Sequence, residues 1–283
     1  MDVHGFIKFC TFTMHLPQSE TLQERGAVQD LGSPNKIHNH CPLLSAGSLH
    51  QHLTMENVPV FTGVVFGLST ILAVLLFYQA AGNSKSTMVV LLLWLALQAA
   101  VSLTGFYTVT AGFPPRFFLL TVPPLVVIIM LFATAGGRRY LDRLDAKTLM
   151  LLHMVRVPVE LVLYSLFVYK AVPQLLTFEG RNFDILSGLS APLIYYFGFV
   201  KERIPVSLLL LWNLVCLGLL VNVVLSAVFS APFAFQRFGF DQPNRAVLYF
   251  PYVWLPCCVV PLVLLAHLSS IRQLIIVQRM KTD

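Results

Sequence analysis

Charged residues are scarce in this sequence of 283 residues. Asp, Glu, Lys and Arg make up only 11% of the chain, whereas they make up about 25% of a typical soluble domain. Hydrophobic residues make up 57%, including 22 phenylalanines, and the mean hydropathy is +0.75. Because so few polar groups cannot cover a water-soluble globule, the composition excludes the ordinary soluble classes and favours an integral membrane protein.

The sequence also lacks the short motifs of several enzyme and binding classes. It contains no GxxxxGK[ST] phosphate loop, no HExxH zinc motif and no GxSxG nucleophile turn. The last apolar run, 252–277, has no lysine to which retinal could attach as a Schiff base. Basic residues form no arginine-rich stripe, so we expect no nucleic-acid partner. These absences argue against an enzyme but do not exclude one.

The five cysteines form no CxxC pair and no even framework, so we predict neither a disulfide scaffold nor a metal site. The adjacent Cys257 and Cys258 fall in an apolar run, where we expect them to act as small packing residues. No cofactor is predicted. One alternative stays open, because His153 and His267 lie at similar depth on two spans and could ligate a b-type haem.

Long apolar runs recur along the chain, and each is long enough to cross a hydrocarbon core of about 30 Å as a helix. They predict an all-α, polytopic transmembrane bundle over residues 55–283. We expect about seven spans, at 58–80, 88–110, 115–135, 148–170, 185–200, 205–230 and 252–277. The fifth is short and carries Gly188 and Pro192, so it could be broken or re-entrant.

Residues 1–54 differ from the rest of the chain. They hold six of the eight histidines and no sustained apolar period. His38, His40 and Cys41 could be read as part of a metal cluster. We interpret the whole segment instead as a disordered or spurious N-terminal extension.

Lysine and arginine are unevenly divided between the two sides of the predicted bundle. Ten lie on one side, at positions 85, 138, 139, 143, 147, 201, 203, 272, 279 and 281, and five lie on the other, at 116, 170, 181, 237 and 245. Cytoplasmic loops carry the excess of positive charge. The pattern therefore predicts an N-out, C-in orientation.

The fourth span carries the polar groups that cost most to bury. His153, Arg156, Glu160 and Tyr164 share one helix face, with Arg156 and Glu160 spaced as i,i+4 partners. A charge at the centre of a span costs about 2.5–3.5 kcal/mol on insertion scales. Such residues often mark function, so we predict an intramembrane polar site here. Its other candidate members are Asn213 and Asn222 on the sixth span.

Two loops on the predicted exterior combine charges with aromatic residues, and we expect them to form an entrance. Their candidate residues are Glu179, Arg181, Asp184, Arg237, Asp241 and Arg245. The leading hypothesis is transport or sensing of a small solute or ion. One alternative is a non-catalytic scaffold or accessory subunit, with a structural ion pair and loops that bind a membrane protein partner. A third is a membrane-embedded redox or lipid-modifying enzyme that uses the two histidines.

Three patterns in the second half resemble a group of small bacterial multi-pass membrane proteins with no assigned activity. They are Asp184-Ile-Leu-Ser-Gly188-Leu-Ser-Ala-Pro192, Trp212-Asn213-Leu-Val-Cys-Leu-Gly218 and the run from Pro256 to Leu274. The resemblance covers roughly residues 148–275 and implies a location in the bacterial cytoplasmic (inner) membrane. It implies no activity. Asn222 stands where an aspartate is expected in such proteins, which weakens an acidic site at that position.

Overall fold

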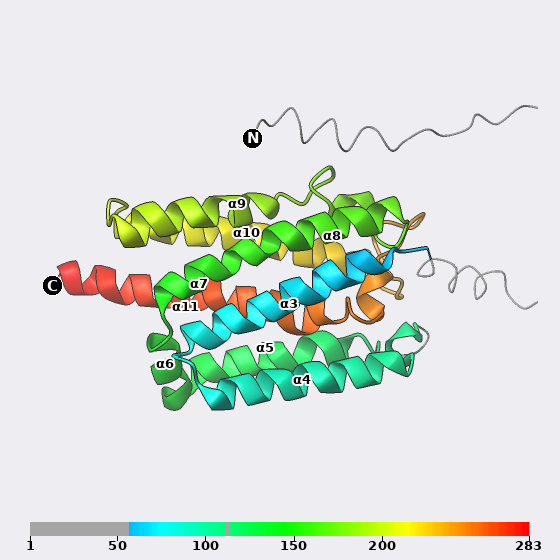
Figure 1. Ribbon diagram of the computed structural model, residues 1–283, viewed down its shortest axis with the longest axis horizontal. Helices are drawn as coiled ribbons and strands as arrows, with labels where there is room; N and C mark the ends of the chain where they lie inside the picture. Colours follow the sequence, from blue (N-terminus) through cyan, green and yellow to red (C-terminus); the bar gives the residue numbers. More distant parts are fainter. Residues whose placement is uncertain (1–56, 111, 113, 283) are drawn as a thin grey trace, which may run out of the picture. The chain divides into compact units, whose positions relative to one another are not determined.

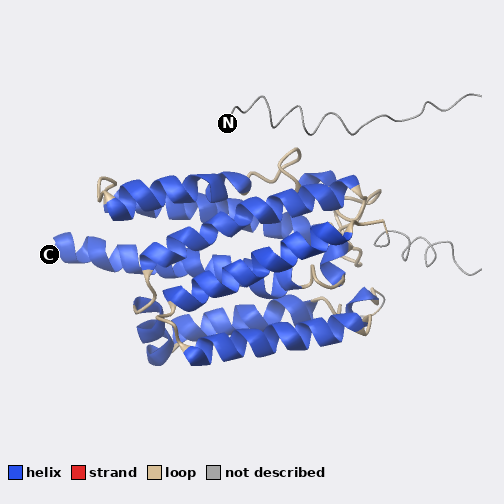
Figure 2. Ribbon diagram, in the orientation of Figure 1, coloured by secondary structure: helices blue, strands red, loops and turns tan. Residues whose placement is uncertain are grey.

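The computed structural model describes residues 57–282, apart from 111 and 113, as a bundle of helices without a strand (Figure 2). The predicted extension 1–54 lies outside the described residues. The helices of 13 residues or more are α3 (Val60–Ala80), α4 (Lys85–Leu103), α5 (Phe118–Ala133), α8 (Arg156–Val168), α10 (Val206–Phe229) and α11 (Val260–Thr282). The shorter α-helices are α6 (Ala135–Asp142), α7 (Ala146–Leu152) and α9 (Ile185–Ile194). The predicted all-α class is confirmed for this part of the chain.

The long helical segments run in alternating directions along the bundle (Figure 1). α7 continues into α8 through a 3-10 turn, and α9 and α11 are extended by π-helical turns at Tyr195–Val200 and Leu255–Val259. Each of the seven predicted spans coincides with a helical segment. The second ends earlier than predicted, at Leu103, because Gly105 adopts a left-handed conformation (φ 74°) and turns the chain.

Five helical segments are long and apolar enough to cross a membrane. They are Val60–Ala80, Lys85–Leu103, Ala146–Val168, Val206–Phe229 and Leu255–Met280. A sixth arises if α5 and α6 are counted together, although the chain bends by 93° between them. The fifth predicted span, Ile185–Val200, is a shorter apolar helix that does not meet the same criterion. The described residues are thus compatible with a multi-pass membrane protein.

Side-chain hydrogen bonds stabilise the bend between α5 and α6. The Thr134 hydroxyl caps α6 by accepting a hydrogen bond from the Gly137 amide, at 3.1 Å. Arg138 donates to the carbonyls of Phe132 and Ala133 at the end of α5. These bonds satisfy groups that a helix end otherwise leaves unpaired. The positively charged α6 is thereby turned away from the axis of α5.

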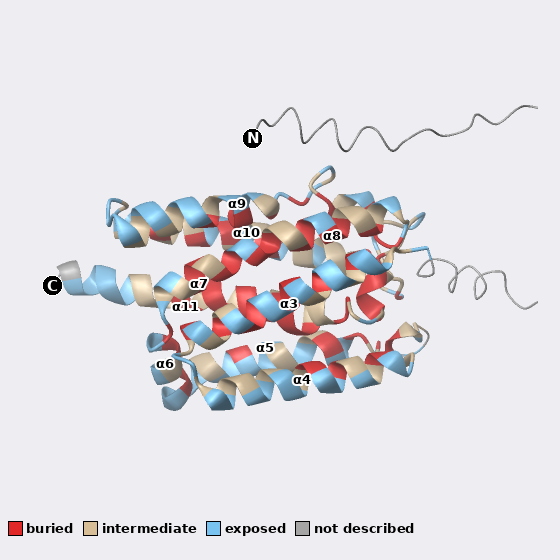
Figure 3. Cartoon of the chain, in the orientation of Figure 1, coloured by how far each residue is buried: buried red, intermediate tan, exposed pale blue. Residues whose placement is uncertain are grey.

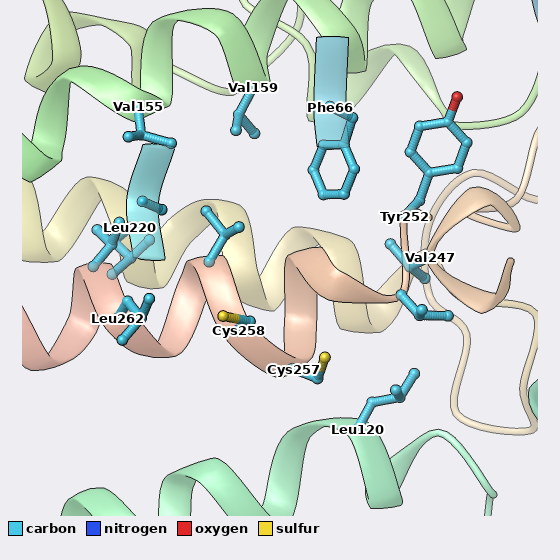
Figure 4. Close-up of a cluster of buried hydrophobic side chains, with 14 of the residues drawn as sticks. Phe66, Leu120, Val155, Val159, Leu220, Val247, Tyr252, Cys257, Cys258 and Leu262 are labelled. Carbon is cyan, nitrogen blue, oxygen red and sulfur yellow. The ribbon is translucent and has the colours of Figure 1, made fainter. Parts of the chain in front are cut away.

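Buried residues lie mostly toward the centre of the bundle (Figure 3), and many of the exposed residues are large and apolar. On α4 and α10, for example, Leu93 and Val215 are more than half exposed. Exposed apolar surface on this scale is typical of a surface that another apolar phase covers. Inside, Cys257 and Cys258 pack in the hydrophobic core as predicted, close to Leu262 (Figure 4).

Candidate functional site

A break in the fourth apolar segment positions its charged residues. The 3-10 turn His153–Val155 separates α7 from α8, and α8 begins at Arg156. Pro158 follows within the first turn of α8, where its missing amide costs least because the first amides of a helix have no intrahelical partner. The sequence therefore starts a new helix in the middle of the bundle, with Arg156 at its first position.

Arg156 is buried, with 4% of its surface exposed, and it bonds to two other segments of the chain. Its Nη1 donates to Oδ1 of Asp184 at 2.8 Å and its Nη2 donates to Nε2 of His267 at 2.9 Å. Among the described residues it forms no ion pair with Glu160. The i,i+4 pairing that the sequence suggests is therefore replaced by a pairing between segments 28 residues apart.

Asp184 reaches Arg156 because the chain enters the bundle before α9 begins. Asn182 and Asp184 are both buried, and the Asn182 side chain organises this non-helical stretch. Its Nδ2 donates to Oε1 of Glu160 at 2.5 Å and to the Leu176 carbonyl at 2.9 Å, and its Oδ1 accepts from the Asp184 amide. Asp184, which was predicted to belong to an exterior entrance, is buried with 5% of its surface exposed, and the adjacent Arg156 supplies its counter-charge.

Gly188 allows α9 to approach α8 closely. A Cβ at this position would lie 2.8 Å from Cγ2 of Val157 and 3.2 Å from Cβ of Arg156. Such distances are too short for ordinary van der Waals contact, so a larger residue would push the two helices apart. Small residues at helix contacts are typical of membrane proteins. Here the glycine holds Asp184, one turn earlier, beside Arg156.

His267 extends the network to α10. Because a guanidinium has no acceptor, Nε2 of His267 must accept from Arg156, and the ring is neutral with its proton on Nδ1. That proton is donated to Oδ1 of Asn213 at 3.0 Å, and Asn213 donates in turn to the Leu209 carbonyl. The hydrogen bonds thus run in one direction from Arg156 through His267 to Asn213.

His153 lies against this network without a hydrogen bond of its own. Its ring stacks on that of His267 with centroids 4.0 Å apart, and Trp212 packs against it edge-on. Neither ring nitrogen of His153 has a partner among the described residues. Two axial haem ligands point their nitrogens at an iron between them, which stacked rings do not do. The described residues also contain no group of three or more His, Cys, Asp or Glu able to hold a metal.

Glu160 is 2% exposed and is the buried acid that lacks an ion-pair partner. Asn182 binds its Oε1, and its Oε2 has no hydrogen-bond partner among the described residues. Glu160 lines a cavity of about 210 Å³, together with Arg156 and Asp184. The other walls are mostly apolar and come from α5, α8, α10 and the start of α11. Three charged side chains therefore border an apolar cavity inside the bundle.

The remaining predicted residues do not line this cavity. Tyr164 is partly buried and stacks on Phe178, with centroids 5.0 Å apart. Asn222 is exposed and donates to the Arg181 carbonyl. Of the other predicted entrance residues, Glu179, Arg181, Arg237 and Asp241 are exposed and Arg245 is partly buried.

Asn182 was not among the predicted site residues, and His267 was considered only as a haem ligand or as a residue of a redox or lipid-modifying enzyme. Asn182 gave no usable signal, because it stands among turn-forming polar residues of a loop. A signal did exist for His267, since a histidine within a predicted span is a candidate partner for an intramembrane arginine or acid.

Residues 113–275 match the model of a family described as Domain of unknown function (DUF8737), and the chain belongs to this family. The match contains every member of the buried network. No curated protein and no solved structure matches the chain.

Proposed function

We propose that this member of the DUF8737 family is a seven-span protein of the bacterial cytoplasmic membrane that transports or senses a small solute or ion at Glu160. In this proposal the amino end lies outside and the more basic end of the bundle faces the cytoplasm, following the distribution of lysine and arginine. Ile185–Val200 and the buried stretch before it together form the fifth span. Non-helical backbone at this depth is tolerated where it is enclosed by protein or lines a cavity.

The observation that carries the proposal is that the two buried acids, Asp184 and Glu160, differ in their bonding partners. Asp184 has a full counter-charge in Arg156 at 2.8 Å, whereas Glu160 has one amide donor and an unpaired Oε2 on a cavity wall. A purely structural network would satisfy both carboxylates, because an unpaired buried polar atom costs about 1–3 kcal/mol. Because this cost is retained, we infer that the carboxyl of Glu160 exchanges a proton or binds a cation.

The scaffold alternative rests on the completed half of the same network. Hydrogen bonds join Arg156, Asp184, His267 and Asn213, with only Nε of Arg156 left unpaired among the described residues, and they could lock four segments together without further chemistry. The two proposals differ in what they require of Glu160. Transport or sensing requires a carboxyl that small molecules can reach, whereas a scaffold permits one that is sealed.

Carbodiimide labelling in liposomes tests this difference. Dicyclohexylcarbodiimide is apolar and reacts with protonated carboxyls that it can reach from the bilayer. We expect one adduct on the folded protein, located at Glu160 by peptide mass spectrometry and lost in Glu160→Gln. Glu179→Gln is the matched control, because Glu179 is exposed at the end of the bundle and should not affect labelling.

The opposite result is equally clear. If Glu160 stays unmodified in the folded protein but reacts once the protein is unfolded in dodecyl sulfate, the carboxyl is sealed and the scaffold is the better proposal. If labelling succeeds, a potassium diffusion potential is imposed across the same liposomes and the internal pH is followed with a dye. We expect the internal pH to change with wild type and not with Glu160→Gln.

A further inference from the structure

The cavity beside Glu160 opens toward the lipid-facing surface of the bundle. Leu125 on α5 and Val221 and Leu225 on α10 line it, and each is between 41% and 50% exposed. The floor is formed by the π-helical turn Leu255–Val259 and the first turns of α11. An apolar molecule dissolved in the bilayer could therefore enter sideways, between α5 and α10, without crossing the aqueous loops.

The inner walls combine apolar contact with a few polar atoms. Val159, Leu220 and Val247 lie among the core side chains drawn in Figure 4, and all three line the cavity. Two lining residues have an unpaired acceptor, namely Oε2 of Glu160 and Oδ1 of Asn244. Asn244 is 1% exposed, and its amide nitrogen already donates to the Ala227 carbonyl. Both free acceptors call for a ligand that brings hydrogen-bond donors.

The charges on the wall select the sign of that ligand. The cavity is lined by one cation, Arg156, and by two acids, Asp184 and Glu160. Because the Arg156 charge is already matched by Asp184, the ionised Glu160 leaves one negative charge over. Arg156 does keep an unpaired donor at Nε, but an anion placed there would also face both carboxylates. A single positive charge complements the wall.

The size of the cavity limits the apolar part. The cavity has a volume of about 210 Å³. This is below the 300 Å³ or so at which pockets for drug-sized ligands begin. A short chain or a single ring with one ammonium group fits, and any longer apolar part would extend through the opening into lipid.

We propose that the cavity binds a small lipophilic amine taken from the bilayer, with its ammonium group on the carboxylate of Glu160. The ligand donates to Oε2 of Glu160, Asn244 offers a second acceptor in the same cavity, and the apolar part contacts α5, α10 and α11. This inference rests on the proposed function and specifies its substrate class. An exposed aqueous site would not favour such a ligand, because there the apolar part would gain nothing by burial.

Three ligands with one hexyl chain and different ends test the sign of the charge. Binding of tritiated hexylamine to the protein in nanodiscs is measured after subtraction of empty nanodiscs, with hexanol and hexanoate as competitors. We expect hexylamine to bind at least tenfold more tightly than either competitor, since charge-assisted hydrogen bonds exceed neutral ones by about that factor. We expect the preference over hexanol to disappear in Glu160→Gln.

Two tryptophan substitutions on α10 test the position. Val221→Trp places a large ring at the opening, whereas Val215→Trp places it on an equally lipid-exposed part of the helix that does not line the cavity. Hexylamine binding should fall at least tenfold in the first variant and remain within twofold of wild type in the second. Both should retain wild-type thermal stability, since both side chains project from the bundle surface.

The inference is overturned if hexanol or hexanoate binds as tightly as hexylamine, or if both tryptophan variants bind alike. That failure can be told apart from a failure of the proposed function. If carbodiimide still labels Glu160, the carboxyl is accessible and only the amine is the wrong ligand. If carbodiimide does not label it and hexylamine does not bind, both proposals fall.

Discussion

An Asp184→Asn substitution would leave the guanidinium of Arg156 buried without its counter-charge. The side chains of the two residues are 4% and 6% exposed, so water cannot replace the lost carboxylate. Removing one member of a buried ion pair typically costs about 3–5 kcal/mol of unfolding free energy. Arg156→Gln should cost a similar amount by stranding Asp184, although the new amide can still donate to His267.

The double variant Arg156→Gln, Asp184→Asn should recover much of this loss. Both charges are then absent, and two amides of similar shape occupy their places. We expect a coupling energy of about 3 kcal/mol, at the upper end of the range for residues in contact. The assay is reversible unfolding in mixed dodecyl sulfate micelles, followed by circular dichroism. Additive losses in the double variant would refute the described pairing.

Two controls make the cycle specific. Glu160→Gln combined with Arg156→Gln should show much weaker coupling, because Glu160 bonds to Asn182 rather than to Arg156. By itself Glu160→Gln should be close to neutral, since a glutamine carbonyl can also accept from Asn182. A strongly destabilised Glu160→Gln would instead mean that the charge stabilises the fold, which would favour the scaffold proposal.

Two further predictions concern packing and pH. Gly188→Ala should destabilise the protein by about 1–3 kcal/mol, because the new methyl group meets Val157, whereas Gly218→Ala on α10 has open space and should not destabilise it in the same unfolding assay. At the basic end of the bundle, the hydrogen bond from Arg272 holds the pKa of Asp142 below its usual value. A lowered folded-state pKa contributes stability above the unfolded value of about 3.9 and loses it as pH falls further. A pH series of wild type against Asp142→Asn checks this, and an equal loss of stability in both below pH 4 would count against the bond.

The predicted spans overlap the described helices because the apolar composition of a run of residues is a local property of the sequence. Runs such as Val206–Phe229 are apolar on all sides, and a helix pairs the polar groups of their backbone within the run itself. The boundaries were less predictable. Leu103 ends α4 seven residues before the expected position, because the backbone conformation of Gly105 turns the chain inside a stretch that still looks apolar.

The candidate site was predicted only in part, for a different reason. Helical spacing placed His153, Arg156 and Glu160 on one face of the same segment, because positions on one element follow from its geometry, and all three are buried in the structure. Spacing suggests partners only within the same helix. Asp184, whose carboxylate lies 2.8 Å from the guanidinium of Arg156, stands in a stretch with the composition of an exterior loop. It was assigned to such a loop on composition alone.

The sequence by itself determines that the part of the chain from residue 57 onward is helical, that its helices are apolar enough for a membrane, and that a few charged groups are placed among them at high cost. Only the tertiary structure decides how each buried charge is balanced. Arg156 meets Asp184 and His267 because Gly188 lets α9 approach α8 and the chain bearing Asn182 turns into the bundle. Those contacts give the carboxylate of Asp184 a counter-charge and leave the carboxylate of Glu160 on the wall of a cavity without one. The difference between the two acids arises from packing between distant segments, and no local pattern contains it.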